Sequence, residues 1–420
     1  MAEAGVRINW GATGPADMVA AARPPLLADG SAAAEMPKVS GLKKLRAIGE
    51  AAGMPTVYAL ATLFLAVTGV AGVWRANVAF APEMYNDRGL VPAVKAFTTG
   101  QNYAVFDLNF NIRKLRELHV AEFTKTPEVV LIGASQWQEA HAGLMQSRRM
   151  YNGHIHRDYW QDLLGEVEIY ARNKRLPKQM IIAIRDKQFT PTGLRKDFLW
   201  EPGIANYQAM ARRLGIEPES SWKTLPYQRI RERLSLTMLF NNVTRWFNAA
   251  ERPHATARKH FAALDTLLPD GSILWSAQHM AVFTPERATH EALALAEANR
   301  DNPPVIDPQG IAAFDKLLTF LKGEGTAVTL VHPPFNPVYW KHVQGGTYTA
   351  GLNKVRQATA ELAAKHGLNI IGDFDPAKIG CTADMYIDAE HSNPDCVVKI
   401  MKQFDDLNAA AGHAKMARTF

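Results

Sequence analysis

The stretch Pro127-Glu128-Val129-Val130-Leu131-Ile132-Gly133-Ala134-Ser135-Gln136 decides our prediction of the fold. Its apolar, β-branched run predicts a short buried strand, and Gly-Ala-Ser follows that strand directly. A serine hydroxyl is therefore expected at the carboxyl end of a strand, which is the edge where open α/β sheets bind their ligands. Ser135 becomes the first candidate for a functional residue.

Strand and helix patterns alternate on both sides of a long interruption. Further buried strands are expected near Met150, over 180–184, over 327–331 and over 368–371. Apolar stripes at helical spacing predict helices over 157–173, 310–321, 352–365 and 397–407. Because parallel strands are ordinarily connected by helical crossovers, this alternation predicts an α/β domain over 127–420 with a parallel sheet.

The interruption, at about 190–305, lacks this alternation. It is rich in helix and turn signals and contains Trp200, Trp222, Trp246 and Trp275. We interpret it as a helical insertion over the active edge of the sheet, where it would act as a lid or a binding surface. A purely structural elaboration, with the tryptophans packing a small core, is the alternative.

The N-terminal part of the chain has a different organisation. Residues Ala51 to Trp74 include no charged side chain. At about 1.5 Å per residue, a helix of this length can cross a hydrocarbon core of roughly 30 Å. We therefore predict a transmembrane helix over 51–75, preceded by a disordered tail over 1–50 and followed by a helical linker region over 76–126.

The basic residues around this span predict its orientation. Several lysines and arginines lie between 38 and 46, whereas only Arg75 follows the span closely. Positive charge favours the cytoplasmic side. We expect a single-pass protein of the inner membrane with a cytoplasmic N-terminus and a periplasmic main domain. A signal peptide cleaved after Ala81 and a buried helix of a soluble domain are the alternatives.

Composition limits the classes of partner. The formal net charge of +6 is small for 420 residues, and no long basic runs alternate with aromatic residues. Nucleic-acid binding is therefore not expected. His154 and His156 stand two apart, but no further ligand residues accompany them at metal-site spacing, so we predict no metal site and no cofactor.

The segment 386–394, Tyr-Ile-Asp-Ala-Glu-His-Ser-Asn-Pro, supplies the partners that a reactive serine needs. A serine hydroxyl becomes nucleophilic when an imidazole takes its proton, and a carboxylate must orient that imidazole. Asp388 and His391 are three positions apart, and the chain order is serine, aspartate, histidine. We predict a catalytic set of Ser135, Asp388 and His391.

The two cysteines of the chain, Cys381 and Cys396, flank this segment. If the segment faces an oxidising compartment, we expect them to form a disulfide with Cα atoms roughly 5 to 6 Å apart. Such a bond would hold the loop that carries Asp388 and His391.

Taken together, these motifs resemble the SGNH/GDSL hydrolase superfamily. Within it they resemble the membrane-anchored, extracytoplasmic proteins of lipoteichoic-acid D-alanylation and alginate O-acetylation. The resemblance covers residue 128 to the C-terminus without the insertion. The matching blocks are Val130 to Ser135, Tyr151-Asn152-Gly153 with Asp158-Tyr159, and Asp388-x-x-His391.

The resemblance implies a three-layer α/β/α, flavodoxin-like domain in which Ser135 is acylated. The backbone N–H groups of Ser135 and Gly153 would bind the oxyanion. The chain departs from the family pattern where Gly-Ala-Ser replaces Gly-Asp-Ser and where Arg185-Asp186 stands in place of the third block's Gly-x-Asn-Asp. Arg185 is therefore the candidate for a third oxyanion donor, and a hole with two donors is the alternative.

Four further residues are candidates for contact with substrate because they follow predicted strands. For two of them simpler roles remain open: an ordinary surface histidine for His154 and a turn residue for His332. The four candidates are Asn152, His154, Asp186 and His332.

The resemblance implies serine-dependent acyl transfer, of the O-acetylation type, to a cell-surface polysaccharide or related glycan. It also implies a membrane-bound O-acyltransferase, or an exopolysaccharide synthesis complex, as the partner. Two alternatives follow from the same residues. One is a carbohydrate esterase or deacetylase, and the other is a catalytically inactive, glycan-binding scaffold.

Overall fold

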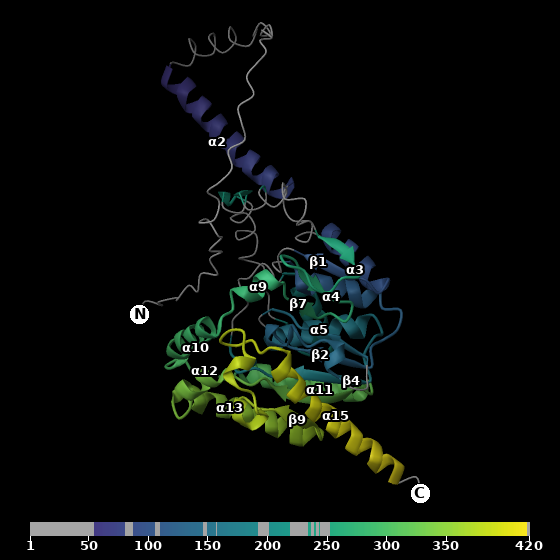
Figure 1. Ribbon diagram of the computed structural model, residues 1–420. Coiled ribbons are helices and arrows are strands. Elements are labelled where there is room, and N and C mark those ends of the chain that lie inside the picture. Colours follow the sequence, from purple (N-terminus) through teal and green to yellow (C-terminus); the bar gives the residue numbers. More distant parts are fainter. Residues whose placement is uncertain are drawn as a thin grey trace. The chain divides into compact units, whose positions relative to one another are not determined.

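The computed structural model describes residues 54–79, 87–105, 110–145, 149–156, 158–191, 201–218, 234–236, 239–240, 243 and 253–417. The predicted disordered tail lies outside these ranges, as do Trp200, Trp222 and Trp246 of the insertion. The chain divides into two compact units, residues 1–66 and 67–420. All the strands belong to the second unit (Figure 1).

A five-stranded parallel sheet forms the centre of the second unit. The strands follow the spatial order β3-β2-β4-β8-β9. Counted along the chain, this is the order 2-1-3-4-5 of flavodoxin-like doubly wound sheets. The predicted parallel sheet is therefore confirmed. The strand bounds are β2 Val129–Ile132, β3 Met150–Asn152, β4 Gln179–Ala183, β8 Ala327–His332 and β9 Asn369–Gly372.

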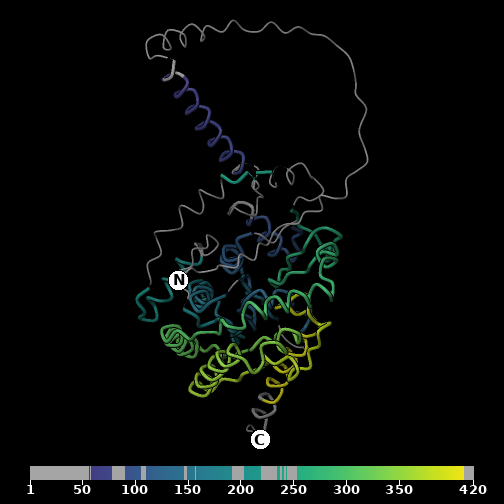
Figure 2. The backbone as a smooth tube through the Cα atoms, turned by 90° about the vertical axis from the view of Figure 1, so that its left-hand side faces the viewer, coloured from purple at the N-terminus to yellow at the C-terminus, as the bar shows by residue number. Residues whose placement is uncertain are grey.

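Helices cover both faces of this sheet, which explains why its strands are apolar runs without polar alternation. Ile132 and Ile182 point into the core formed with α5 (Trp160–Arg172), α11 (Pro308–Gly323) and α13 (Thr347–His366). Leu131 and Ile181, one position earlier on each strand, face α15 (Pro394–Ala417). Figures 1 and 2 show α12 (Pro337–Val343) and α13 together with α10 (Pro285–Asn299) at one end of this unit.

A second, antiparallel sheet was not predicted. Its order is β5-β1-β6-β7, and the strands are β1 Asn102–Val105, β5 His254–Thr256, β6 Asp265–Leu267 and β7 Ile273–Leu274. β1 lies in the linker region predicted as helical, between α3 (Asp87–Thr98) and α4 (Ile112–Ala121), and the insertion supplies the other three strands. These strands have two to four residues, too short for an alternating pattern to be recognised.

The helical part of the insertion includes α6 (Glu201–Arg213), α9 (Ala277–Ala281) and α10. Trp275, the one insertion tryptophan in the described ranges, packs edge-on against His279 and Phe283, with ring centroids 3.8 and 5.6 Å away. Trp275 is half-buried in this cluster of three rings.

The turn between β6 and β7 lies against the central sheet. The N–H of Asn152 donates to Asp270 O at 2.6 Å, and the N–H of Ile273 donates to Gln138 O at 2.8 Å. Gly271, in this turn, has φ +85°, and a Cβ there would lie 2.2 Å from Asn152 O. Only glycine permits both that backbone angle and that approach. The insertion therefore braces the loop that follows Ser135.

Among the residues that the structure describes, one helix is long and apolar enough to cross a membrane. α2 spans Met54–Ala79, and its residues Tyr58–Asn77 meet the length and hydropathy expected of a span. This agrees with the predicted transmembrane segment in position and character.

Candidate active site

Ser135 and Arg185 lie on either side of the point where the sheet changes winding direction. Ser135 is three residues beyond β2, and Arg185 is two residues beyond the neighbouring strand β4. In doubly wound sheets, ligands bind in the crevice outside the carboxyl ends of these two strands. Gly133, just before the serine, has no room for a side chain, because a Cβ would lie 2.6 Å from Ala183 Cβ.

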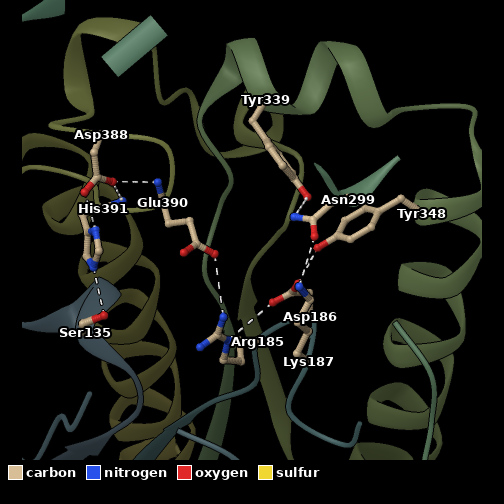
Figure 3. A network of polar contacts seen from close by, with 10 residues as sticks. All are labelled: Ser135, Arg185, Asp186, Lys187, Asn299, Tyr339, Tyr348, Asp388, Glu390 and His391. Carbon is tan, nitrogen blue, oxygen red and sulfur yellow. Dashed lines mark hydrogen bonds and ion pairs between the residues drawn. The ribbon is translucent and has the colours of Figure 1, made fainter. Parts of the chain in front are cut away.

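At this point Ser135 meets two side chains that are distant from it in the sequence (Figure 3). His391 Nε2 lies 2.9 Å from Ser135 Oγ, and His391 Nδ1 lies 2.7 Å from Asp388 Oδ2. Both distances are within hydrogen-bond range. The predicted residues are therefore brought together in the arrangement serine, imidazole, carboxylate.

Hydrogen bonds within the loop and to the segment 334–336 hold Asp388 and His391 in place. Asp388 Oδ1 accepts the N–H groups of Glu390 and His391, both at 2.8 Å. The Asp388 carbonyl accepts a hydrogen bond from Asn336 Nδ2 at 3.0 Å, and Tyr386 Oη donates to Pro334 O at 3.2 Å. Every oxygen of Asp388 thus has a defined partner, which fixes the carboxylate toward the imidazole.

A disulfide closes the base of this loop. Cys381 and Cys396 are bonded, with Cα atoms 5.3 Å apart, and the bond closes a separation of 15 residues. Both cysteines are buried, in a small cluster with Tyr386. The bridge therefore ties the start of α15 to the segment that precedes Asp388.

The charges of the histidine and the carboxylate stabilise each other. Burial disfavours the charged form of each, but the Asp388 carboxylate raises the pKa of His391 above its usual value. Burial is likewise outweighed at Asp388, where His391 and the two backbone N–H groups lower the pKa. An imidazole with a raised pKa, hydrogen-bonded to a serine, is suited to accept the hydroxyl proton.

Glu139 is a further carboxyl beside this set that the sequence reasoning missed. It is buried, and burial together with Asp388 raises its pKa to about 7, against an opposing effect of His391. It also contributes to raising the pKa of His391. Its position four residues after Ser135 was the only sequence signal, and a glutamate in a turn is too common to be informative.

Arg185 connects the loop of Asp388 and His391 to a second polar network (Figure 3). Its Nη2 lies 3.7 Å from Glu390 Oε1, and its Nε lies 3.5 Å from Asp186 Oδ1. Asp186 Oδ2 accepts a hydrogen bond from the Tyr348 hydroxyl. Burial alone would lower the pKa of Arg185, but the carboxylates of Asp186 and Glu390 raise it above its usual value. The guanidinium therefore stays charged.

The same network extends away from the serine. Asn299 Nδ2 donates to Tyr339 Oη at 3.1 Å, and Lys187 Nζ donates to Asn299 Oδ1 at 3.1 Å (Figure 3). Asp186 is only 2% exposed. Its position assigns it to orienting Arg185, in place of the substrate contact that we had predicted.

The prediction that Gly153 donates to the oxyanion needs correction. The Gly153 N–H donates to Leu131 O at 2.7 Å, because it continues the hydrogen bonds between β3 and β2. That N–H group is therefore already hydrogen-bonded within the sheet and does not face an oxyanion. Ser135 and Gln136 open the short 3-10 helix Ser135–Trp137, whose first N–H groups have no acceptor within the helix. The N–H groups at that turn and Arg185 remain as candidate donors.

Two other residues predicted to contact substrate have internal partners. Asn152 Nδ2 donates to the carbonyls of Trp137 and Ala140 at 2.6 and 3.0 Å, so it supports the loop after the serine. His332 stacks on Phe374 with ring centroids 4.5 Å apart, and burial lowers its pKa to about 4. Both side chains are buried. The geometry assigns them to packing.

His154 is fully buried. Its Nδ1 lies 3.2 Å from both Arg116 Nη2 and Asn152 Oδ1. Burial, with the positive charge of Arg116, lowers its pKa well below the usual value. His154 is therefore a neutral ring that supports the site from within, and it is not a surface histidine.

No protein-family model and no curated protein matches the chain. The interpretation of the site therefore depends on its geometry. In this site a serine hydroxyl is hydrogen-bonded to an imidazole, and the imidazole is hydrogen-bonded to a buried carboxylate. A serine in that arrangement can attack the carbonyl carbon of an ester or similar acyl group.

Proposed function

We propose that this chain is a membrane-anchored, SGNH-type serine enzyme that transfers an acyl group, of the acetyl class, to a hydroxyl of a cell-surface polysaccharide or related glycan. The observation that carries the proposal is the hydrogen-bonded sequence from Ser135 through His391 to Asp388. Its position outside the carboxyl ends of β2 and β4 supports a ligand-binding crevice there.

In the first half of the reaction, Ser135 Oγ attacks the carbonyl carbon of the acyl donor. His391 Nε2 takes the hydroxyl proton as the new C–O bond forms, and Asp388 stabilises the imidazolium. The tetrahedral intermediate collapses when the bond to the leaving oxygen breaks. His391 returns its proton to that oxygen, and an acyl ester on Ser135 remains.

In the second half, an acceptor hydroxyl takes the place of the leaving group. His391 accepts the proton of that hydroxyl, its oxygen attacks the acyl carbon, and collapse breaks the bond to Ser135 Oγ. The proton returns to the serine. If water is the acceptor, the same steps give hydrolysis, so the chemistry of the site serves both a transferase and an esterase.

The negative charge that develops on the carbonyl oxygen must be stabilised in both halves. Donors preorganised for that charge commonly contribute about 3 kcal/mol each. The N–H groups that begin the 3-10 helix at Ser135 are suited to this, and Arg185 supplies a nearby permanent positive charge. Arg185 takes the part that an asparagine side chain has in the SGNH pattern.

The proposed location follows from α2. A single span that precedes the enzyme unit would keep the active site close to a membrane-bound acyl donor, such as a membrane-bound O-acyltransferase. We propose the orientation indicated by the basic residues between 38 and 46, with the enzyme unit in the periplasm. The disulfide between Cys381 and Cys396 supports an oxidising compartment.

The decisive experiment is labelling of the full chain in detergent with a fluorophosphonate probe, followed by hydrolysis of nitrophenyl acetate. We expect the wild type to be labelled and active, and Ser135→Ala to lose both properties. Ser276→Ala is the matched control, because Ser276 caps α9 with its side chain and is expected to retain activity. A wild type that is neither labelled nor active would overturn the enzyme proposal and favour a glycan-binding scaffold.

Transfer and hydrolysis are separated with a labelled acetyl donor and added acetyl-free oligosaccharides. Transfer predicts that label appears on the sugar and that release of free acetate falls as the acceptor concentration rises. Free acetate that is unaffected by any acceptor would indicate the esterase.

A further inference from the structure

Between residues 73 and 77, most side chains of α2 are partly or fully covered. Most of the apolar residues before this stretch are largely exposed, whereas Val73, Trp74 and Ala76 are half-buried and Asn77 is only 2% exposed. Asn77 Nδ2 donates to Ser235 O at 3.0 Å. A segment of the insertion therefore lies against the point where the predicted span ends.

A helical turn begins at Leu236, directly after Ser235, and its apolar side chains differ in exposure. The Leu239 N–H donates to Ser235 O at 3.0 Å, as in a helical turn. Ser235, Leu239 and Val243, spaced four apart, are half-buried. Leu236 and Phe240, also four apart, are 68% and 71% exposed. Outside α2, these are the two most exposed large apolar side chains in the described ranges.

The sequence around these residues has the composition of a helix that lies in a membrane interface. Residues 231–247 read RERLSLTMLFNNVTRWF, with leucine, phenylalanine and tryptophan combined with three arginines and one acidic residue. Interfacial helices have this composition, with basic residues on the polar side and Leu, Phe or Trp on the other. These two exposed side chains lie beside a proposed membrane span. The apolar medium available to cover them there is lipid.

We propose that the helical turn of Leu236 and Phe240 lies in the headgroup region of the bilayer that α2 crosses, with both side chains inserted among the lipids. This inference rests on the membrane span assumed under the proposed function. The end of a span is at the level of the headgroups, and Asn77 hydrogen-bonds this turn at that level. The enzyme unit would then have two points of attachment, α2 and this turn, which restrict how it can rotate about its anchor.

The test uses single cysteines in the full chain, reconstituted in vesicles of phosphatidylcholine and phosphatidylglycerol. The two native cysteines form the disulfide, so an introduced cysteine is the only free thiol. Leu236→Cys and Phe240→Cys are labelled with the fluorophore NBD, and quenching by lipids that carry a nitroxide in the shallow part of the acyl chain is measured. Leu63→Cys, inside the span, is the positive control. Val305→Cys is the matched negative control, since Val305 is 55% exposed between α10 and α11.

We expect nitroxide lipids to lower the emission at positions 236 and 240 at least twofold, as at position 63, and to leave position 305 unchanged. Quenching at 63 combined with no quenching at 236 and 240 would overturn the proposal and leave the membrane span intact. No quenching at 63 would overturn the span, and with it this proposal. Neither result would bear on the labelling of Ser135, so this inference and the proposed chemistry fail separately.

Discussion

His391 Nε2 lies 2.9 Å from the Ser135 hydroxyl, although 256 positions separate the two residues in the chain. The disulfide and the hydrogen bonds to Asp388 hold the loop that carries the imidazole. Polar groups that are held in place in this way avoid much of the reorganisation that a reaction would otherwise require.

The first prediction concerns the pH dependence of the reaction of Ser135. His391 must be neutral to accept a proton, and its pKa is raised. The rate of fluorophosphonate labelling should therefore rise with pH through an apparent pKa above 6.5. In Asp388→Asn the carboxylate that raises this pKa is lost. The acid limb should move to lower pH, and the maximal rate should fall by roughly 10⁴, as it does when the orienting aspartate of a triad is neutralised.

Asp315→Asn is the control for this prediction. Asp315 also pairs with a histidine, His366, at 2.7 Å, but on α11 and α13. It should leave the labelling profile unchanged. An acid limb that stays in place in Asp388→Asn would show that His391 is not the base.

The second prediction concerns stability and Glu139. Burial raises its pKa from an ordinary 4.5 to about 7, so the folded state retains the proton to a higher pH than the unfolded chain does. The free energy of unfolding should therefore fall as pH rises from about 4.5 to 7, by an amount on the order of 3 kcal/mol. Glutamine has no carboxyl group to titrate, so the free energy of unfolding of Glu139→Gln should not show this fall with pH. The thermal midpoint of the variant should exceed that of the wild type at pH 8 and approach it at pH 5.

Glu128→Gln is the comparison, because the Glu128 side chain, in the same region, is 43% exposed and forms a surface ion pair with Arg149. Its effect on the thermal midpoint should be small at every pH. If the thermal midpoints of Glu139→Gln and the wild type differ by the same amount at pH 5 and pH 8, the carboxyl of Glu139 does not have the raised pKa assigned to it.

The third prediction concerns the charge of Arg185. Its contacts with Glu390 and Asp186 are long, at 3.7 and 3.5 Å, so its guanidinium is not tightly paired. If it stabilises the oxyanion, Arg185→Gln should lower kcat for nitrophenyl acetate by roughly 10² to 10³, as does loss of one oxyanion donor, with little effect on KM. Arg185→Lys should recover part of the loss. A change in KM alone would assign Arg185 to ground-state binding.

Much of the central fold follows from the sequence because its inner strands β2 and β4 are buried on both faces. The run Val129 to Ile132 was predicted with the bounds it has, and the predicted strand over 327–331 extends one residue further, to His332. The antiparallel sheet could not be predicted in the same way. β7 has two residues, and β1 pairs with β5 across more than a hundred positions, so local sequence contains almost no information on either.

The candidate site likewise contains residues that the sequence predicts and residues that it does not. Ser135, Asp388 and His391 could be named because their chemistry requires those residue types in a recognisable order. The Gly153 donor was wrong because a backbone N–H has no sequence signature, and only the register of β3 against β2 shows that Leu131 O already accepts it. Glu139 was missed because its raised pKa depends on burial, which three-dimensional packing decides.

The fourth prediction concerns the disulfide. It closes a loop of 15 residues, and a crosslink of that length is expected to contribute about 3 kcal/mol by restricting the unfolded chain. The double variant Cys381→Ala, Cys396→Ala should have a lower thermal midpoint than the wild type, and a reducing agent should lower the midpoint of the wild type only. Labelling of Ser135 should slow at temperatures below the midpoint, because the loop with His391 loses its tie to α15. Unchanged labelling would mean that the hydrogen bonds of Asp388 alone position the imidazole.

The last prediction tests whether the turn between β6 and β7 supports the loop that follows Ser135. Gly271→Ala would place a Cβ 2.2 Å from Asn152 O and would also strain a backbone angle of φ +85°. Gly215→Ala isolates the second effect, because Gly215 has φ +64° and open space where its Cβ would lie. The strain alone should cost about 1 kcal/mol, whereas the clash in Gly271→Ala adds more, because the backbone of one segment must move. That movement would disturb the bond from Ile273 N–H to Gln138 O, three residues beyond the serine. We therefore expect Gly271→Ala, and not Gly215→Ala, to slow fluorophosphonate labelling of Ser135. Equal labelling rates in the two variants would assign the turn to stability only.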